Sequence, residues 1–213
     1  MIKAVIFDVD RSLVDSKKPE FNSFKKAYFE LRKENVPEYV LNNLSNNTTK
    51  KTYSLLNLNS DEISKLNHYW DIYLKAENID FFEGIKDLLI KLKKEGILLG
   101  ILTSRNTDEL KELEDIFEDV YNLFDIVMTV DKIYKPKPDP SGLNLIKEKL
   151  NLNSDEIIYV GDHYNDMLCS KGAGVIFGYA KWDDDLPELD TKYVFEKPID
   201  VLNLVNEINY NNY

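Results

Sequence analysis

Residues 4–10 read AVIFDVD, which is four apolar residues followed by two aspartates one residue apart. Similar short apolar runs recur along the chain, at residues 97–102, 126–130, 157–160, 175–177 and 193–195. Helical patterns separate most of these runs, at residues 84–95, 108–117, 141–150 and 198–208. Strands that are apolar on both faces and alternate with helices predict an α/β fold with a doubly wound parallel sheet.

One segment, residues 16–80, breaks this alternation because it shows helical patterns and no strand pattern. One apolar helical stripe begins near Pro19, and a second follows a helix start at Ser60. We therefore expect an all-helical insertion that forms a separate cap, on a core made of residues 1–15 and 81–213.

Composition narrows the functional classes. The net charge of −11 leaves no basic surplus for a nucleic-acid backbone, although local cations can still bind a small anion. No apolar stretch approaches the roughly 20 residues that span a bilayer. The single cysteine, Cys169, excludes an internal disulfide and fits a reducing compartment. We expect a cytoplasmic monomer or homodimer with neither nucleic acid nor a membrane as partner.

Four polar clusters follow apolar runs, at residues 8–10, 103–105, 135–140 and 161–166. Each alone has a purely structural interpretation: aspartates after strands cap turns, Thr103 or Ser104 can start a helix, and alternating lysine and proline can form an exposed turn. In an open parallel sheet, however, the carboxyl ends of the strands lie on one edge, where ligands bind. We therefore expect the four clusters to converge in one site.

The residue types in these clusters favour phosphoryl transfer with a metal ion. Two carboxylates about 4 Å apart repel each other by roughly 4 kcal/mol at an effective dielectric constant near 20, so several together need a cation. Oxygen ligands point to Mg2+, which would also orient a phosphate. One aspartate can attack phosphorus to give an aspartyl-phosphate, and another can transfer the proton. A lysine and a threonine hydroxyl can hold phosphate oxygens.

The order of these motifs resembles the phosphatases of the haloacid dehalogenase (HAD) superfamily. FDVDRSLVDS is similar to the family's first motif, FEGIKDLLIKLKKEGILLGILTS to the approach to its second, and VGDHYNDMLCSKGAG to its fourth. The helical stretch falls where the phosphoglycolate phosphatase-like branch inserts its helical, C1-type cap. The resemblance covers the whole chain and implies a Rossmann-like core.

The resemblance also implies a role for each matching residue. Asp8 would be the nucleophile, Asp10 the acid and base, and Thr103 a hydrogen-bond donor to the transferred phosphoryl group. Mg2+ would be held by Asp8, the backbone carbonyl of Asp10 and Asp162, with Asp166 supporting the metal less directly.

Two lysines compete for the remaining catalytic position, because Lys135 and Lys137 both begin a K-P-x-P motif. We favour Lys137, because its distance to the fourth strand matches the family. Lys135 would then lie at the rim of the site, where it and Ser104 could bind substrate or phosphate.

Arg11 departs from the family pattern, in which glycine usually follows the second aspartate. Two hypotheses follow: Arg11 points outward as a tolerated change, or it reaches the site and binds a substrate anion or partly blocks entry.

The leading functional prediction is a Mg2+-dependent phosphatase that hydrolyses a small phosphorylated metabolite, with phosphoglycolate as the leading substrate by family branch. One alternative is a phosphosugar mutase or a pyrophosphatase of the same superfamily. A second alternative is a catalytically impaired binding or regulatory protein, which the arginine at position 11 makes conceivable.

Overall fold

A computed structural model describes residues 1–41, 44, 49–183 and 186–210 of the chain. Its residues group into two compact units. The larger unit contains Met1–Asp15 and Asp80–Tyr213, and the smaller one contains Ser16–Ile79. The predicted functional residues all belong to the larger unit, so the fold of that unit determines how they meet.

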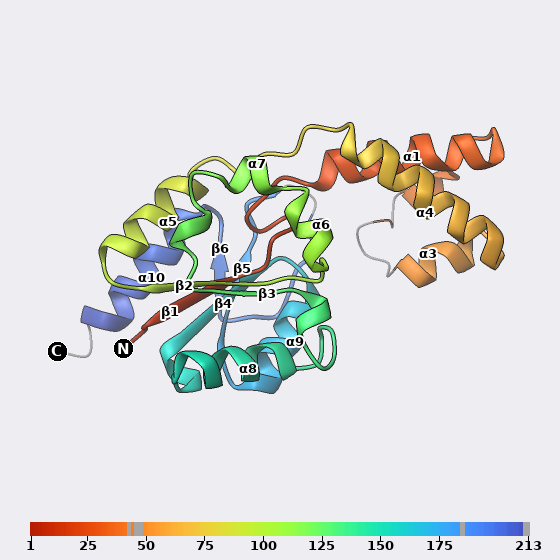
Figure 1. Ribbon diagram of the computed structural model, residues 1–213. Helices are drawn as coiled ribbons and strands as arrows, with labels where there is room; N and C mark the ends of the chain where they lie inside the picture. Colours follow the sequence, from red (N-terminus) through yellow and green to blue (C-terminus); the bar gives the residue numbers. More distant parts are fainter. Residues whose placement is uncertain (42–43, 45–48, 184–185, 211–213) are drawn as a thin grey trace. The chain divides into compact units, whose positions relative to one another are not determined.

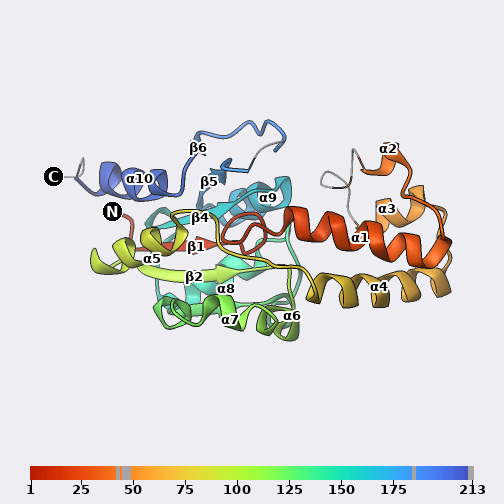
Figure 2. The ribbon, with the colours of Figure 1, turned by 90° about the horizontal axis from the view of Figure 1, so that it is seen from above.

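A six-stranded parallel sheet runs through the larger unit. Its strands are β1 (Ala4–Phe7), β2 (Leu98–Leu102), β3 (Ile126–Met128), β4 (Ile157–Gly161), β5 (Ile176–Ala180) and β6 (Tyr193–Phe195). They lie in the order β3-β2-β1-β4-β5-β6, and every neighbouring pair is parallel. Figure 2 labels β2, β1, β4, β5 and β6 side by side in that order. The predicted doubly wound α/β fold is confirmed.

Helices cover both faces of this sheet. They are α5 (Ile85–Lys94), α6 (Thr107–Lys111), α7 (Glu114–Phe117), α8 (Ser141–Leu150), α9 (Tyr164–Ala173) and α10 (Ile199–Tyr210), with 3-10 turns η2 (Tyr121–Leu123), η3 (Val130–Lys132) and η4 (Ser154–Glu156). In Figure 1, α5 and α10 lie on one face of the sheet, and α8 and α9 lie on the other.

An apolar stripe explains why α5 forms and packs where it does. Ile85, Leu88, Leu89 and Leu92 are buried and recur with helical spacing. The three lysines of its last turn complement the helix dipole. The helix therefore needs no capping side chain to be fixed against β2.

Two elements differ most from the sequence-based boundaries. The helix expected at residues 108–117 is divided into α6 and α7, because the backbone N–H of Leu113 bonds to Leu110, three residues back, and tightens the turn. Strand β5 continues beyond its expected end at Phe177 and includes Gly178. A Cβ atom at Gly178 would overlap the buried ring of Phe195, so glycine is required where β6 packs closely.

The smaller unit is all helical in its described residues. It contains α1 (Lys17–Arg32), α2 (Glu38–Leu41), α3 (Thr49–Leu55) and α4 (Ser60–Lys75). Phe24 of α1 meets the ring of Trp70 of α4 edge-on at 5.1 Å, and the Trp70 indole N–H donates to the hydroxyl of Ser23 at 3.0 Å. Phe24 and Leu66 are fully buried, so this unit has its own apolar core.

None of the helices in the described ranges is both long and apolar enough to cross a membrane.

The substitution Gly178→Ala tests the packing of β6 on β5. We expect it to lower the free energy of unfolding by about 1–3 kcal/mol, because the new methyl group must displace the Phe195 ring. Urea denaturation measures the change. Gly172→Ala is the matched control: its Cβ would lie 3.2 Å from Pro140, and the helix gains from alanine, so its stability should change little. Equal effects of the two substitutions would contradict the packing argument.

Candidate active site

The register of the three central strands brings their carboxyl ends within one residue of each other. Phe7 of β1 pairs with Ile101 of β2 and with Val160 of β4. The residues that follow these strands therefore come out at the same edge of the sheet. In this way, chain segments that are far apart in sequence bring Asp8 and Asp162 together.

Three carboxylates converge at this edge. One ligand oxygen from each of Asp8, Asp162 and Asp166 lies within 4.8 Å of the others, and all three residues are buried. A compact set of hard oxygen donors suits a divalent cation such as Mg2+ or Mn2+. The cluster could therefore hold a metal ion.

Lys137 links two of these carboxylates. Its Nζ lies 2.8 Å from Oδ1 of Asp8 and 2.7 Å from Oδ1 of Asp166, and it donates to the hydroxyl oxygen of Tyr159 at 3.1 Å. The lysine side chain is only 6% exposed, so these charges attract each other with little screening by water. Lys137 is therefore a fixed part of the acidic cluster.

Both carboxylate oxygens of Asp166 accept hydrogen bonds. Its Oδ1 accepts a hydrogen bond from the Tyr159 hydroxyl at 2.9 Å, and its Oδ2 accepts one from the backbone N–H of His163 at 3.0 Å. The His163 imidazole accepts from the N–H of Asn165, so it caps α9. A Cβ at Gly161 would lie 2.6 Å from Cβ of Asp166, so the close approach of this carboxylate requires glycine there.

Burial dominates the electrostatics of the cluster. Burial, with smaller contributions from Asp166 and Asp10, raises the pKa of Asp8 to about 7 against the lowering effect of Lys137. Burial also raises the pKa of Asp162 well above the usual range. Burial by itself lowers the pKa of Lys137, but the neighbouring Asp166 and Asp8 outweigh it and raise the pKa. The carboxylates therefore lack sufficient positive charge from the protein alone.

Arg105 forms a bidentate ion pair with Asp10, the second aspartate of the first motif. Its guanidinium donates to both oxygens of the Asp10 carboxylate, from Nε at 2.8 Å and from Nη2 at 2.6 Å. The backbone N–H of Arg105 donates to Oγ1 of Thr103, which is buried directly after β2. The bidentate geometry fixes the orientation of Asp10.

Arg11 lies inside the protein. Its residue is 8% exposed, and its Nε lies 3.2 Å from Oδ2 of Asp183 and 3.6 Å from Oδ2 of Asp162. Its backbone φ of 58° is in the left-handed region that favours glycine. Of the two hypotheses for Arg11, this geometry matches the one in which the side chain reaches the cluster.

Two predicted residues lie outside these contacts. The side chain of Lys135 is 58% exposed, and its ammonium lies 3.8 Å from Asp139, four residues on. Ser104 is exposed after β2. Of the two candidate lysines, the structure brings Lys137 to the carboxylates.

Sequence reasoning missed three residues of the site, Arg105, Tyr159 and Asp183. Tyr159 carried a usable signal, because a tyrosine within a buried apolar strand needs a partner for its hydroxyl group. Arg105 stands within a recognised motif, but nothing in its spacing indicates Asp10 as its partner. Asp183 follows β5 by a few residues, and no motif marks it.

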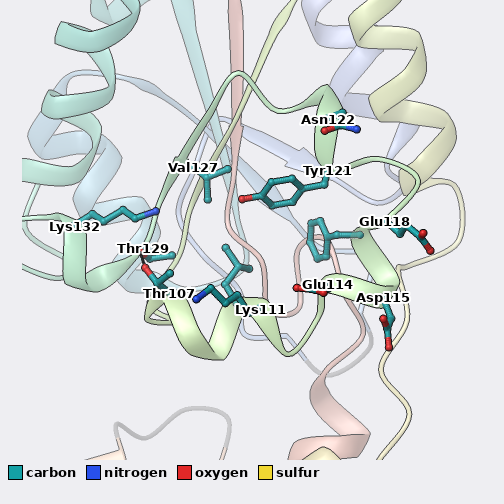
Figure 3. Close-up of a pocket in the computed structure, with 12 residues that line it drawn as sticks. Thr107, Lys111, Glu114, Asp115, Glu118, Tyr121, Asn122, Val127, Thr129 and Lys132 are labelled. Carbon is teal, nitrogen blue, oxygen red and sulfur yellow. Dashed lines mark hydrogen bonds between the residues drawn. The ribbon is translucent and has the colours of Figure 1, made fainter.

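A separate pocket of about 500 Å³ lies beside β3 and contains none of the predicted site residues (Figure 3). Leu110, Phe117 and Val127 give it an apolar wall, and Lys111, Glu114 and other charged residues surround it. This pocket therefore does not belong to the acidic cluster.

The chain belongs to the haloacid dehalogenase-like hydrolase family, because a model of that family matches residues 5–180. The expected superfamily is confirmed, and the chain is a hydrolase.

Known proteins similar to this chain extend over almost its full length. Pyrophosphatase PpaX from Bacillus velezensis is 26% identical over 213 residues, which cover 95% of this chain and 96% of the relative. A Lactobacillus plantarum structure provisionally assigned as a phosphoglycolate phosphatase has a TM-score of 0.80 and 23% identity, covering 96% of this chain and 99% of that one. A provisionally assigned β-phosphoglucomutase from Thermotoga maritima has a TM-score of 0.77 and 20% identity, covering 97% and 100%. The two structures demonstrate the shared fold.

The raised pKa of Asp8 predicts a pH-dependent stability of the metal-free protein. A carboxyl group whose pKa is about 7 when folded and about 4 when unfolded favours folding at low pH, and this contribution is lost as pH rises through that window. Relative to Asp8→Asn, the wild type should therefore lose up to about 4 kcal/mol of unfolding free energy between pH 4 and pH 7. Urea denaturation in the presence of a chelator measures this.

The control is Asp155→Asn, which removes an exposed carboxylate at the opposite end of β4. Its stability difference from the wild type should stay constant over the same pH window. A constant difference for Asp8→Asn would contradict the predicted charge burial.

Proposed function

We propose that this chain is a Mg2+-dependent phosphatase that hydrolyses a small phosphomonoester through an aspartyl-phosphate on Asp8. The observation that carries this proposal is the buried group of Asp8, Asp162 and Asp166 with Lys137 bound between two of its members. The family supports hydrolysis, and the named relatives act in phosphoryl chemistry. Phosphatase is therefore the enzyme class that fits both the site and the relatives.

Asp8 is the nucleophile in this proposal. Lys137 contacts its Oδ1, which leaves Oδ2 to attack the phosphorus atom. The ester bond then breaks, and the phosphoryl group is carried on Asp8. Lys137 cannot swing away easily, because Asp166 and Tyr159 hold it in place. The lysine therefore orients the nucleophile, and its positive charge attracts the negatively charged phosphoryl group.

The carboxylates of Asp8, Asp162 and Asp166 suit a divalent cation; Mg2+ would be held by oxygens of Asp8 and Asp162 and by the backbone carbonyl of Asp10, and Asp166 would support the metal less directly. A bound Mg2+ supplies positive charge that offsets the repulsion among the carboxylates and the charge of the phosphate.

Asp10 is the proton-transferring group in this proposal. It gives a proton to the leaving oxygen and later takes one from the water that hydrolyses the aspartyl-phosphate. Arg105 contacts both oxygens of Asp10, so it acts as a positioning residue. Thr103 would donate its hydroxyl hydrogen to the transferred phosphoryl group, and Ser104, Lys135 and Arg11 remain proposed contacts for substrate or phosphate.

The helical unit Ser16–Ile79 is proposed to serve as the cap that selects the substrate. It folds as a compact unit with its own core, as a cap requires. A cytoplasmic location and a monomeric or homodimeric state also remain predictions.

Phosphoglycolate is the leading substrate by family branch, and a structure provisionally assigned as a phosphoglycolate phosphatase shares this fold. Inorganic pyrophosphate is the second candidate, because the pyrophosphatase PpaX relative matches this chain over 95% of its length. A phosphosugar mutase would require that the aspartyl-phosphate be protected from water. An impaired binding protein would retain the acidic cluster without turnover.

A substrate screen tests the proposal. The wild type should release phosphate from p-nitrophenyl phosphate and from at least one of phosphoglycolate and pyrophosphate, with Mg2+ and not with a chelator. Asp8→Asn should lower kcat by about 1000-fold or more, because the nucleophile is lost. Asp155→Asn should retain wild-type rates. An inactive wild type, or equal rates for Asp8→Asn and wild type, would refute the catalytic assignment.

Substitution of Arg105 tests how Asp10 is oriented. Arg105→Gln should lower kcat by about 10- to 100-fold, because Asp10 loses its bidentate partner. The kcat of Arg105→Lys should lie between those of the wild type and Arg105→Gln, since an ammonium group is a point charge without the planar fork of a guanidinium. Steady-state kinetics with p-nitrophenyl phosphate and with an alkyl phosphate measure this. If glutamine and lysine at position 105 behave as the wild type does, Arg105 does not position Asp10.

A further inference from the structure

Arg11 is placed beside the metal-binding carboxylates by the turn that follows β1. The backbone N–H of Arg11 donates to the carbonyl of Val14 at 2.8 Å, which closes the turn. The left-handed φ of 58° costs a non-glycine residue free energy, so this arginine is kept in place by its surroundings. Its side chain is turned into the protein, where the residue is 8% exposed.

The Arg11 guanidinium lies between two carboxylates. It hydrogen-bonds to Asp183 at 3.2 Å, and it lies 3.6 Å from Oδ2 of Asp162. The side chains of the three residues are 7–12% exposed, so water screens these charges weakly. Its Nη2 is buried and has no hydrogen-bond partner among the described residues. Arg11 is therefore a fixed positive charge whose donors are not all used by the protein.

Asp162 is also one of the three carboxylates that can share a metal ion. A divalent ion bound there must approach a carboxylate that Arg11 already partly neutralises, and the two cations repel each other over a few ångströms. Asp183 acts in the opposite direction, because it holds the guanidinium from the other side and adds a negative charge.

We propose that Arg11 is a resident cation of the metal site, which competes with the divalent ion for Asp162 and keeps metal affinity low, while Asp183 limits this competition. The inference rests on the proposed function, since it takes the acidic cluster to be the metal site. It assigns Asp183, which follows β5 and belongs to none of the four motifs, a role in tuning that site.

Metal binding without substrate tests the inference. Isothermal titration calorimetry with Mg2+ and electron paramagnetic resonance with Mn2+ give the Kd of the chelator-treated protein. Arg11→Gln removes the charge and leaves a shorter polar side chain that can still donate hydrogen bonds, and it should tighten metal binding by about tenfold. Arg11→Lys keeps the charge and should stay within about threefold of the wild type.

Asp183→Asn tests the same balance from the opposite side. Of the two carboxylates beside Arg11, Asp162 alone then keeps its charge, so Arg11 competes more strongly with the metal for Asp162. The metal Kd should therefore rise by about three- to tenfold. This arm also decides the question if Arg11→Gln fails to fold, which circular dichroism would reveal. Tighter or unchanged metal binding by Asp183→Asn would overturn the inference.

Asp162→Asn separates the two levels of the proposal. If metal binding depends on Asp162 but Arg11→Gln binds with a wild-type or weaker Kd, the inference is overturned and the proposed function stands. If the wild type and Asp162→Asn bind metal equally, the assignment of the metal site itself fails, and the inference fails with it.

Discussion

The carboxylates of Asp8, Asp162 and Asp166 meet at the carboxyl edge of a buried sheet, and their repulsion must be offset by positive charge. Much of the surrounding structure supplies or positions that charge. At an effective dielectric constant near 20, each pair of carboxylates about 4 Å apart costs roughly 4 kcal/mol. Lys137 offsets part of this cost by bonding to Asp8 and Asp166 at once. Burial, together with the neighbouring carboxylates, still raises the pKa values of Asp8 and Asp162. A site of this kind stores electrostatic free energy that a cation can release.

The backbone makes this crowding possible. Parallel pairing of β1 with β2 and with β4 fixes the ends of three strands at one level, so their following residues cannot avoid one another. Gly161 then allows α9 to bring Asp166 close to β4, where a Cβ would collide with its side chain. His163 caps the N-terminus of α9 and so fixes where that helix starts. Small local requirements thus position the charged groups to within hydrogen-bonding distance.

Two arginines divide the remaining carboxylates between them. Arg105 takes both oxygens of Asp10, whereas Arg11 lies between Asp162 and Asp183. Each cation thus contacts a different aspartate, and Asp8 is left with Lys137. This distribution gives Asp10 and Asp8 different cationic partners, although they are two residues apart in the chain. Arg11 achieves its position at the cost of a left-handed backbone conformation.

The sequence alone was enough to predict the parallel sheet and the family, because apolar strand runs and the polar residues after them are local patterns. It also favoured Lys137 over Lys135. In the folded chain Lys137 contacts Asp8, whereas the side chain of Lys135 is exposed to solvent. The partners of the arginines were out of reach of sequence reasoning. Arg105 and Asp10 are 95 residues apart, and Arg11 and Asp183 are 172 apart. Which cation faces which carboxylate depends on strand order, turn geometry and burial, and these physical constraints exist only once the chain has folded.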